Sequence, residues 1–416
     1  MTAGLRRGRE TSSQRRRRRS LLPSLAITGA LTVSLAGLAP AAAADAGPDQ
    51  WYLEAMQAEE IWKVSTGKGV KVAVVDSGVN GSTPSLKGQV LPGRDVTGKS
   101  GDETNDSHGH GTTMAELIAG TGKNSGIKGL APGAKIIPIR TTTADPDKEV
   151  DWSKYSDADR AIRAAADSDA QIINLSFGGE YYSTRVEAAV QHAVKKGKLV
   201  FAAVGNDGDG KNKTHYPASL EEAVAVSAVD QTAKAAKFSQ HGQYVDLAAP
   251  GQDLPGWCKG NFDRYCTGER GTSQATALAS ASAALIWSEH KDWTANQVLR
   301  VMMETAGKPK DGKVPSTRVG YGVVRPNDVL LKGEGDPGAP GENPLTGAKT
   351  EPSKPSSTSP STGSGNNDDK GAADKVNVAD STESDDDSKL GLILGTGAAV
   401  AVLAVGAFAF VRMRRR

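Results

Sequence analysis

The chain has 416 residues, with 50 Lys and Arg side chains against 48 Asp and Glu side chains. This near balance, with no basic domain, argues against nucleic acid as a partner. Arginine runs stand at both ends of the chain, and both ends resemble targeting or membrane segments rather than parts of a folded core.

The N-terminus has the layout of a secretory signal peptide. Residues 15–19 are all arginine, residues 21–38 are mostly apolar, and residues 41–44 are all alanine. A charged region, a short apolar region and a small-residue cleavage site follow one another in such signals, so we expect a signal peptide over residues 1–44. An N-terminal membrane anchor is the alternative, but Pro23 and Ser24 interrupt an apolar stretch that is already short for one.

The C-terminus predicts a transmembrane helix over residues 389–411. About 22 residues without a charge would span roughly 33 Å as a helix, enough to cross a bilayer. Arginines follow in the tail at residues 412–416, and the positive-inside rule assigns that tail to the cytoplasm. A cell-wall sorting signal would need an L-P-x-T-G motif here, where residues 384–389 read S-D-D-D-S-K. We therefore expect a single-pass protein of the cell membrane, held by lipid contacts of this helix, with its body outside the cell.

Between these ends we expect one folded domain and a tether. Residues 333–388 are rich in Pro, Gly, Ser and Thr and then in Asp, a composition that cannot bury a core and predicts a disordered linker. The domain then covers residues 45–332, which suffices for one large hydrophobic core.

Short apolar runs alternate with helical patterns inside this domain. The runs, at residues 70–75, 135–139, 172–177, 199–204, 224–229 and 244–248, are predicted strands, and the apolar spacing over residues 186–194 is that of one helix face. Alternation of this kind predicts an α/β fold in three layers with a mainly parallel central sheet. Functional residues of such sheets lie beyond the carboxyl ends of the strands.

The first run ends in Asp76-Ser77-Gly78. A D-S-G triplet is also typical of aspartic proteases, but these need two carboxylates that share a proton, and no second D-S-G or D-T-G occurs in the chain. An ordinary turn at the end of a strand is the remaining alternative for this triplet alone.

Two histidines, His108 and His110, precede a short apolar helix pattern at residues 114–119. Histidines two residues apart, without a Cys or Glu partner at a known spacing, are a weak zinc signal. A polar surface loop is the plain alternative. The Gly-rich approach to a helix start favours a rigidly held histidine.

Two further motifs combine a helix start and a strand end with polar side chains. Ser273 begins a long pattern of small residues, where a backbone N–H at a helix N-terminus is free to donate to an oxyanion, although a helix-capping serine is common. Asn206 follows a predicted strand in a Gly-rich turn and is either a turn residue or a side-chain donor to an oxyanion.

Together these motifs resemble the subtilisin-like serine proteases, whose catalytic residues follow the chain order Asp, His, Ser. The resemblance covers about residues 51–331, and the family motif H-G-T-x-V/M-A selects His110 over His108. It implies a serine endopeptidase with Asp76, His110 and Ser273 as its triad, and Asn206 as the side chain of the oxyanion hole. It also implies substrate-binding segments that include Ser176, Phe177, Gly178, Gly179, Ala203 and Gly205.

Within that family the chain is most similar to the mycosins, the membrane-anchored proteases of actinobacterial type VII secretion. The order of signal peptide, protease domain, tether, helix and basic tail carries this resemblance, which implies protein or peptide substrates and the secretion machinery as a partner. A catalytically silent scaffold for a secretion complex, or an adhesin on a stalk, are the alternative functions. An intact triad argues against both.

The sequence departs from the family at Gln274, where Met is usual, and at Ala277, where Pro is usual. Proline there shapes the first helical turn, so its loss puts the position of the Ser273 backbone in question. The stretch from Asp45 to about Val64 is too short for a long inhibitory prodomain, and the resemblance suggests that it wraps onto the domain.

Cys258 and Cys266 are the only cysteines, and export favours a disulfide between them. Two free buried thiols are the alternative, since two thiolates alone do not complete a zinc site. No cofactor is expected. Calcium is common in the family, but no Asp-rich loop here has a suitable spacing, so no metal site is assigned.

Overall fold

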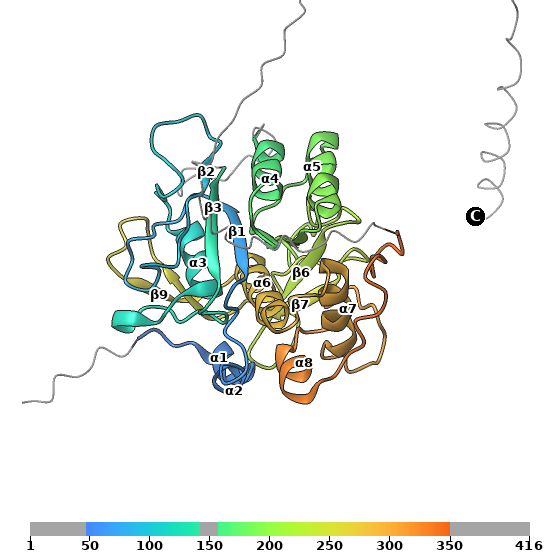
Figure 1. Ribbon diagram of the computed structural model, residues 1–416. Helices are drawn as coiled ribbons and strands as arrows, with labels where there is room; N and C mark the ends of the chain where they lie inside the picture. The colour runs from blue at the N-terminus through green and yellow to red at the C-terminus, as the bar shows by residue number, and fades with distance from the viewer. Residues whose placement is uncertain (1–46, 142–156, 350–416) are drawn as a thin grey trace, which may run out of the picture. The chain divides into compact units, whose positions relative to one another are not determined.

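Figure 1 shows the computed structural model of the chain, which describes residues 47–141 and 157–349. The predicted signal peptide at residues 1–44, the transmembrane helix at 389–411 and the basic tail at 412–416 lie outside these residues. Within the two described ranges, no helix is both long enough and apolar enough to cross a membrane.

The centre of the domain is a parallel sheet of seven strands in the order β2-β3-β1-β4-β5-β6-β7. This confirms the predicted α/β fold with its mainly parallel sheet. The strands are β1 (Lys71–Asp76), β2 (Arg94–Asp95), β3 (Lys135–Arg140), β4 (Ile172–Leu175), β5 (Leu199–Ala203), β6 (Val224–Val229) and β7 (Leu247–Pro250).

The predicted strands at residues 172–177 and 244–248 differ most from the strands observed. Strand β4 stops at Leu175, before Ser176 and Phe177, because the Ser176 carbonyl accepts a hydrogen bond from a helix side chain instead of a neighbouring strand. Strand β7 starts at Leu247 rather than at residue 244, because a turn in which Val245 N–H donates to the Gly242 carbonyl precedes it.

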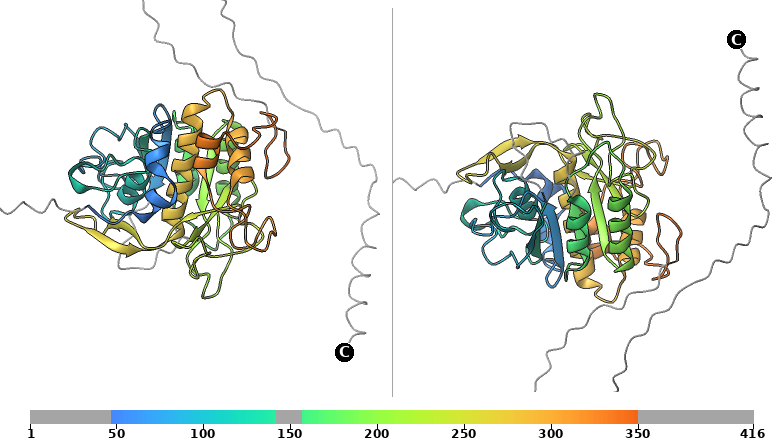
Figure 2. Two further views of the ribbon diagram at one scale, coloured as in Figure 1. Left: turned by 90° about the horizontal axis from the view of Figure 1, so that it is seen from below. Right: turned by 90° about the horizontal axis from the view of Figure 1, so that it is seen from above.

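Each face of the sheet packs on a separate set of helices, as the two views of Figure 2 show. Side chains alternate along β1, so Val72 and Val74 enter one core while Ala73 and Val75 enter the other. Helices α4 (Ala158–Ala166) and α5 (Thr184–Lys195) cover the second core. The first core lies under α1 (Trp51–Ala55), α2 (Ala58–Ile61), α3 (His110–Ala119), α6 (Thr272–Glu289), α7 (Ala295–Thr305) and α8 (Pro326–Lys332).

Helix α6 is buried from Thr272 to Ser288 and contacts β4, β5, β6 and β7. Its Ala- and Ser-rich composition lets the helix backbone approach the sheet closely. The buried hydroxyls remain hydrogen-bonded, since Ser280 donates to the Asn174 side chain of β4 at 3.1 Å and Ser282 donates to the Leu278 carbonyl at 2.8 Å. The sheet thereby fixes where this helix begins.

The N-terminal stretch wraps onto the domain, as predicted, over its described residues 47–64. Tyr52 is fully buried and its hydroxyl donates to the Lys128 carbonyl at 3.1 Å. The indole of Trp51 donates to the carbonyls of Gln252 and Asp253, each at 3.1 Å. These contacts hold α1 against a loop about 200 residues later in the chain.

An antiparallel hairpin of β8 (Leu254–Trp257) and β9 (Tyr265–Glu269) lies against α3 and was not predicted. The predicted disulfide between Cys258 and Cys266 closes it, with 4.9 Å between the two Cα atoms. Because the bridge lies at the turn of the hairpin, it holds the chain that leads towards α6.

A buried carboxylate ties this hairpin to α3. Glu116 accepts hydrogen bonds from the Tyr265 hydroxyl at 2.8 Å and from the Thr83 hydroxyl at 2.7 Å. Burial raises the pKa of Glu116 to about 7, although these hydrogen bonds oppose the shift. The Glu116 carboxylate is fully buried in the middle of α3, and through its two hydrogen bonds it joins α3 to the hairpin and to the segment at Thr83.

The predicted start of the disordered linker, at Gly333, is too early. Residues 333–349 are described, and they pack along α7. The Pro340 carbonyl accepts a hydrogen bond from the Thr294 hydroxyl at 2.9 Å, and the Asn343 side chain is buried. Composition indicated a tether here, but these hydrogen bonds to α7 order its first part. Linker residues 350–388 lie outside the described ranges.

Candidate active site

Asp76 and His110 meet at the carboxyl edge of the sheet. Asp76 is the last residue of β1 and His110 the first of α3, and the His110 Nδ1 lies 2.8 Å from the Asp76 Oδ1. The Asp76 side chain is only 5% exposed, whereas that of His110 is 41% exposed. The carboxylate therefore orients a histidine ring that a ligand can reach.

Glycine is required on the C-terminal side of this histidine. A Cβ on Gly111 would lie 2.1 Å from the Gly78 carbonyl oxygen and 3.0 Å from the Asp76 Cβ. Any side chain there would push α3 away from the end of β1 and separate His110 from Asp76. This contact explains why glycine follows the histidine in the H-G-T motif.

Asp106, which sequence reasoning did not select, organises the approach to His110. Its Oδ1 accepts hydrogen bonds from the Ser77 hydroxyl at 2.9 Å, His108 N–H at 3.0 Å and Gly109 N–H at 2.9 Å. Its Oδ2 accepts from the Thr112 N–H at 2.9 Å and from the Thr112 hydroxyl at 2.6 Å. Its position carries no simple capping signal, because the cap residue of α3 is Gly109 and Asp106 lies three residues before it.

The pKa of His110 is raised above its ordinary value by a balance of opposed effects. Burial lowers it, but the charge of Asp76, the hydrogen bond to that carboxylate and the charges of Asp106 and Glu269 together outweigh burial. The imidazolium is therefore stabilised at this position, which is what a group that accepts a proton during a reaction needs.

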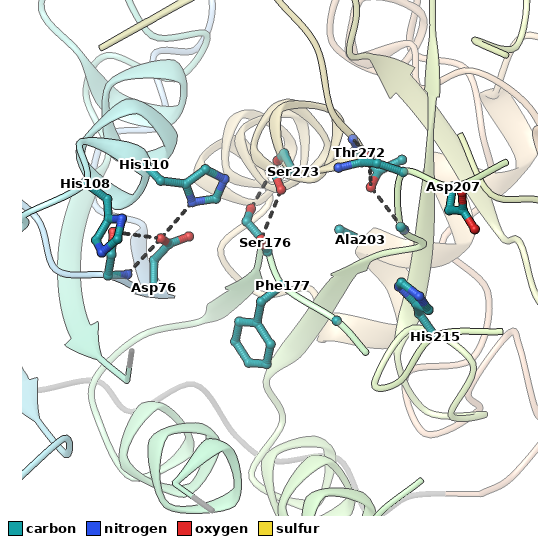
Figure 3. Close-up of a pocket in the computed structure, with 14 residues that line it drawn as sticks. Asp76, His108, His110, Ser176, Phe177, Ala203, Asp207, His215, Thr272 and Ser273 are labelled. Carbon is teal, nitrogen blue, oxygen red and sulfur yellow. Dashed lines mark hydrogen bonds and ion pairs between the residues drawn. The ribbon is translucent and has the colours of Figure 1, made fainter. Parts of the chain in front are cut away.

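Ser273 lies in the first turn of α6, with its Oγ directed into the cavity edge (Figure 3). The Oγ donates to the Ser176 carbonyl at 3.0 Å, and the Ser176 hydroxyl donates to the Ser273 carbonyl at 3.1 Å. Among the described residues, no hydrogen bond joins Ser273 to His110. Proton transfer from Ser273 to His110 would therefore need the Ser273 side chain to rotate towards the imidazole, and hydrogen bonds of this kind commonly tighten when substrate binds.

The two departures from the family pattern leave α6 intact. The helix runs without a break through the fully buried Ala277, and the Thr276 hydroxyl donates to the Thr272 carbonyl at 2.7 Å in the first turn. Gln274 buries its Oε1, which has no hydrogen-bond partner among the residues that the structure describes. Ser273 is the second residue of this unbroken helix.

Asn206 follows β5 and faces the same space. Its Oδ1 accepts hydrogen bonds from the Thr272 N–H at 2.8 Å and from the Thr272 hydroxyl at 3.0 Å. These two bonds fix which way the amide points and leave the Nδ2 group without a protein acceptor among the described residues. The side chain is thus held as a hydrogen-bond donor near the start of α6.

Asp76, His110, Asn206 and Ser273 all line one cavity of about 420 Å³. Five of the six predicted substrate-binding residues line it, namely Ser176, Phe177, Gly178, Ala203 and Gly205. Gly179 does not, because its N–H and carbonyl both pair with Tyr216. The sequence did not single out three other lining residues, Asp207, His215 and Thr272.

His108 also lines the cavity, but the structure gives no reason to read it as a metal ligand. No group of three or more His, Cys, Asp or Glu side chains placed to hold a metal ion occurs within the two described ranges.

Comparison with known proteins identifies the family. A sequence model of the Subtilase family (peptidase S8) matches residues 67–322, which is more than half of the chain. The chain belongs to the subtilase family.

A thermophilic serine proteinase of Bacillus sp. (strain AK1) is 37% identical to this subtilase over 248 residues, which are 59% of the present chain and 58% of that protein. The chain thus spans little more than half the length of this relative.

Solved structures of secretion-associated proteases share the fold. The MycP3 protease from the type VII (ESX-3) secretion system has a TM-score of 0.58 and 29% identity, covering 70% of the present chain and 90% of its own. A chain of the periplasmic assembly from the ESX-5 inner membrane complex has a TM-score of 0.59 and 27% identity. The match covers 68% of the present chain and 84% of that chain. The expected similarity to the mycosins is confirmed.

Replacing Asp106 by Asn should move the acid limb of the kcat/KM profile to lower pH. The substitution removes one of the negative charges that raise the His110 pKa, so the imidazole stays neutral, and able to accept a proton, at lower pH. The variant should also lose about tenfold in kcat/KM, because an amide N–H₂ cannot accept the bonds that the carboxylate accepts. Hydrolysis of a chromogenic peptide between pH 5 and 9 measures both effects.

The matched control for this test is Asp102→Asn, since Asp102 is an exposed carboxylate of the same loop. It should leave the profile unchanged. An unshifted acid limb in the Asp106→Asn enzyme would contradict the role of its charge.

Replacing Asn206 by Ala should lower kcat by about 10²-fold to 10³-fold and change KM little, the usual result of removing one oxyanion donor. Asn206→Asp is the informative companion, because Asp retains an oxygen that accepts from Thr272 but has no N–H to donate. Steady-state kinetics should show that both variants are impaired. Recovery of kcat in the Asp variant would mean that Asn206 only supports the backbone at Thr272.

Proposed function

We propose that this chain is a serine endopeptidase that cleaves peptide bonds through an acyl-enzyme, with Asp76, His110 and Ser273 as its triad. The observation that carries the proposal is the 2.8 Å contact between His110 and the buried Asp76, at a cavity that also exposes Ser273. The three groups come from β1, α3 and α6, and their order along the chain is that of the family.

In the proposed mechanism, Ser273 Oγ attacks the carbonyl carbon of the scissile bond while His110 takes its proton through Nε2. Asp76 holds Nδ1 and stabilises the imidazolium that forms. The His110 proton then passes to the leaving amine, and water hydrolyses the ester by the same steps. Attack requires the Oγ to leave the Ser176 carbonyl, which is then free to pair with the backbone of the substrate.

Asn206 Nδ2 and the Ser273 N–H are the proposed donors to the oxyanion. Thr272 fixes the Asn206 amide, and Ser273 lies in the first turn of α6, where backbone N–H groups have no partner within the helix. The segments around Ser176 and Ala203 form the two sides of the cavity in Figure 3, and we propose that the substrate binds between them.

We further propose that the enzyme is exported and anchored in the cell membrane, where it acts beside the type VII secretion machinery. The predicted signal peptide and the uncharged stretch at residues 390–411 support the anchor. Similarity to a chain of the ESX-5 inner membrane complex supports the partner. No cofactor is required by the proposed chemistry.

The triad is tested by labelling the full-length protein, extracted in detergent, with a fluorophosphonate. Wild type should be labelled and should cleave peptides, whereas Ser273→Ala should do neither and His110→Ala should lose activity almost completely. His108→Ala is the matched control and should keep most of its activity. An inactive His108→Ala with an active His110→Ala would show that the wrong histidine has been assigned, and an unlabelled wild type would favour a catalytically silent scaffold.

Anchoring is tested by comparing the full chain with a chain truncated before Leu390, in the bacterium that makes it. The full chain should sediment with membranes and copurify with the type VII complex, and the truncated chain should appear in the medium. Release of the full chain, or retention of the truncated one, would contradict a C-terminal anchor.

A further inference from the structure

His215 occupies the cavity on the far side of Ser273 from His110. Figure 3 shows the two histidines at opposite ends, with Ser273 and Ala203 between them. His215 belongs to the loop between β5 and β6 and is partly buried. The proposed chemistry gives this titratable side chain no role.

The backbone holds His215 firmly in place. Its carbonyl accepts hydrogen bonds from the Ser219 N–H at 3.1 Å and from the Ser219 hydroxyl at 2.9 Å. The next residue, Tyr216, pairs with Gly179 through two backbone hydrogen bonds of 2.8 and 3.0 Å. His215 is therefore fixed beside the Gly179 segment and by the turn that ends at Ser219, so it cannot move away with a flexible loop.

Small residues leave room for the His215 ring at the cavity wall. A Cβ on Gly205 would lie 2.5 Å from the His215 Nδ1, and a Cβ on Gly178 would lie 3.5 Å from the His215 Cβ. The imidazole thus lies beside Gly178 of the Ser176 segment and Gly205 of the Ala203 segment. A substrate side chain that passes between these segments from Ser273 reaches this ring.

The ring nitrogens of His215 have no hydrogen-bond partner among the described residues. A neutral imidazole offers one N–H donor and one nitrogen acceptor, and a carboxamide side chain offers the complementary acceptor and donor. The ring can therefore bind an uncharged amide without help from another group.

The charges around His215 make this end of the cavity negative while the ring is neutral. Glu180 forms an ion pair with Lys213, so their opposite charges largely offset each other at the cavity. Asp207 also lines the cavity and has no ion-pair partner among the described residues. Gln240, which approaches Gly205 beside the ring, carries no charge. One unbalanced carboxylate remains, and it repels an acidic side chain.

The pKa of His215 is consistent with a neutral ring at neutral pH. Partial burial lowers the pKa, and it outweighs the opposing charges of Glu180 and Asp207, while Lys213 adds to the lowering. Protonation, which needs a lower pH here than for an ordinary histidine, would supply a positive charge that balances Asp207.

We propose that His215 selects the substrate residue whose carbonyl Ser273 attacks, accepting Gln or Asn over Glu or Asp at neutral pH and losing this discrimination when the ring is protonated. The inference rests on the proposed protease function and names a class of substrate for it. The selectivity comes from one hydrogen-bonding ring and one unpaired carboxylate at the end of the cavity.

The test uses two peptides that differ only in Gln or Glu before the scissile bond. The ratio of their kcat/KM values cancels the titration of His110, which both share, and the peptide Glu stays mostly ionised down to pH 5. For the full-length wild type, the preference for Gln should fall about threefold to tenfold between pH 7.5 and pH 5.0. His215→Gln should give a ratio that does not change with pH.

His241→Gln is the matched control, since His241 lies outside the cavity lining, and it should keep the wild-type pH dependence. A wild-type ratio that is constant with pH, or a His215→Gln ratio that still varies, would overturn the role of His215 and leave the protease function intact.

A second measurement separates this inference from the proposed catalysis. Fluorescent versions of the two peptides are bound to the Ser273→Ala protein, and anisotropy gives their affinities at both pH values. A preference for Gln that weakens at pH 5.0 in Ser273→Ala, and that does not change with pH in Ser273→Ala/His215→Gln, supports the inference even if wild type cleaves neither peptide. Failure of wild type to cleave either peptide would contradict the protease function alone. An affinity ratio that does not change with pH would contradict the role of His215.

Discussion

The geometry of this site depends on one buried carboxylate, that of Asp106. It accepts five hydrogen bonds, which join the residue after β1, the loop before α3 and the first turn of α3. A buried charge is tolerated only when it is satisfied in this way, so the loop cannot move without exposing an unpaired carboxylate. The contact between Asp76 and His110 follows from that constraint. The hairpin then holds the middle of α3 in place, through the hydrogen bond from Tyr265 to Glu116.

Helix α6 imposes the complementary constraint on Ser273. Its small side chains let it lie buried on four strands, and the hydroxyl of Ser280 replaces a lost water contact by bonding to Asn174. A helix fixed along its length cannot shift its first turn independently, which is why Ala277 in place of the usual Pro leaves the start of α6 unbroken. The first turns of α3 and α6, two helices that pack together on the same face of the sheet, thereby face each other across the cavity.

The two histidines at the ends of the cavity show how surroundings decide the chemistry of one residue type. Bonded to a buried carboxylate and near two more, His110 has a raised pKa and suits proton transfer. His215 is partly buried, and its acidic neighbours are too weakly coupled to offset that burial, so its pKa is lowered and a neutral ring faces the cavity. The first arrangement serves a reaction and the second serves recognition.

The sequence by itself determined the α/β class, the strand order along the chain, the cysteine pair and the candidate residues Asp76, His110, Asn206 and Ser273, because local motifs and apolar periodicity carry that information. Tertiary structure alone decided that Asp106 and His215 belong to the site, since their partners are set by packing between segments distant in the chain. The tertiary structure also decided that residues 333–349 pack on α7, although their composition had predicted a disordered linker. Hydrogen bonds between distant segments leave no periodic trace in a sequence, and only the folded chain brings those partners together.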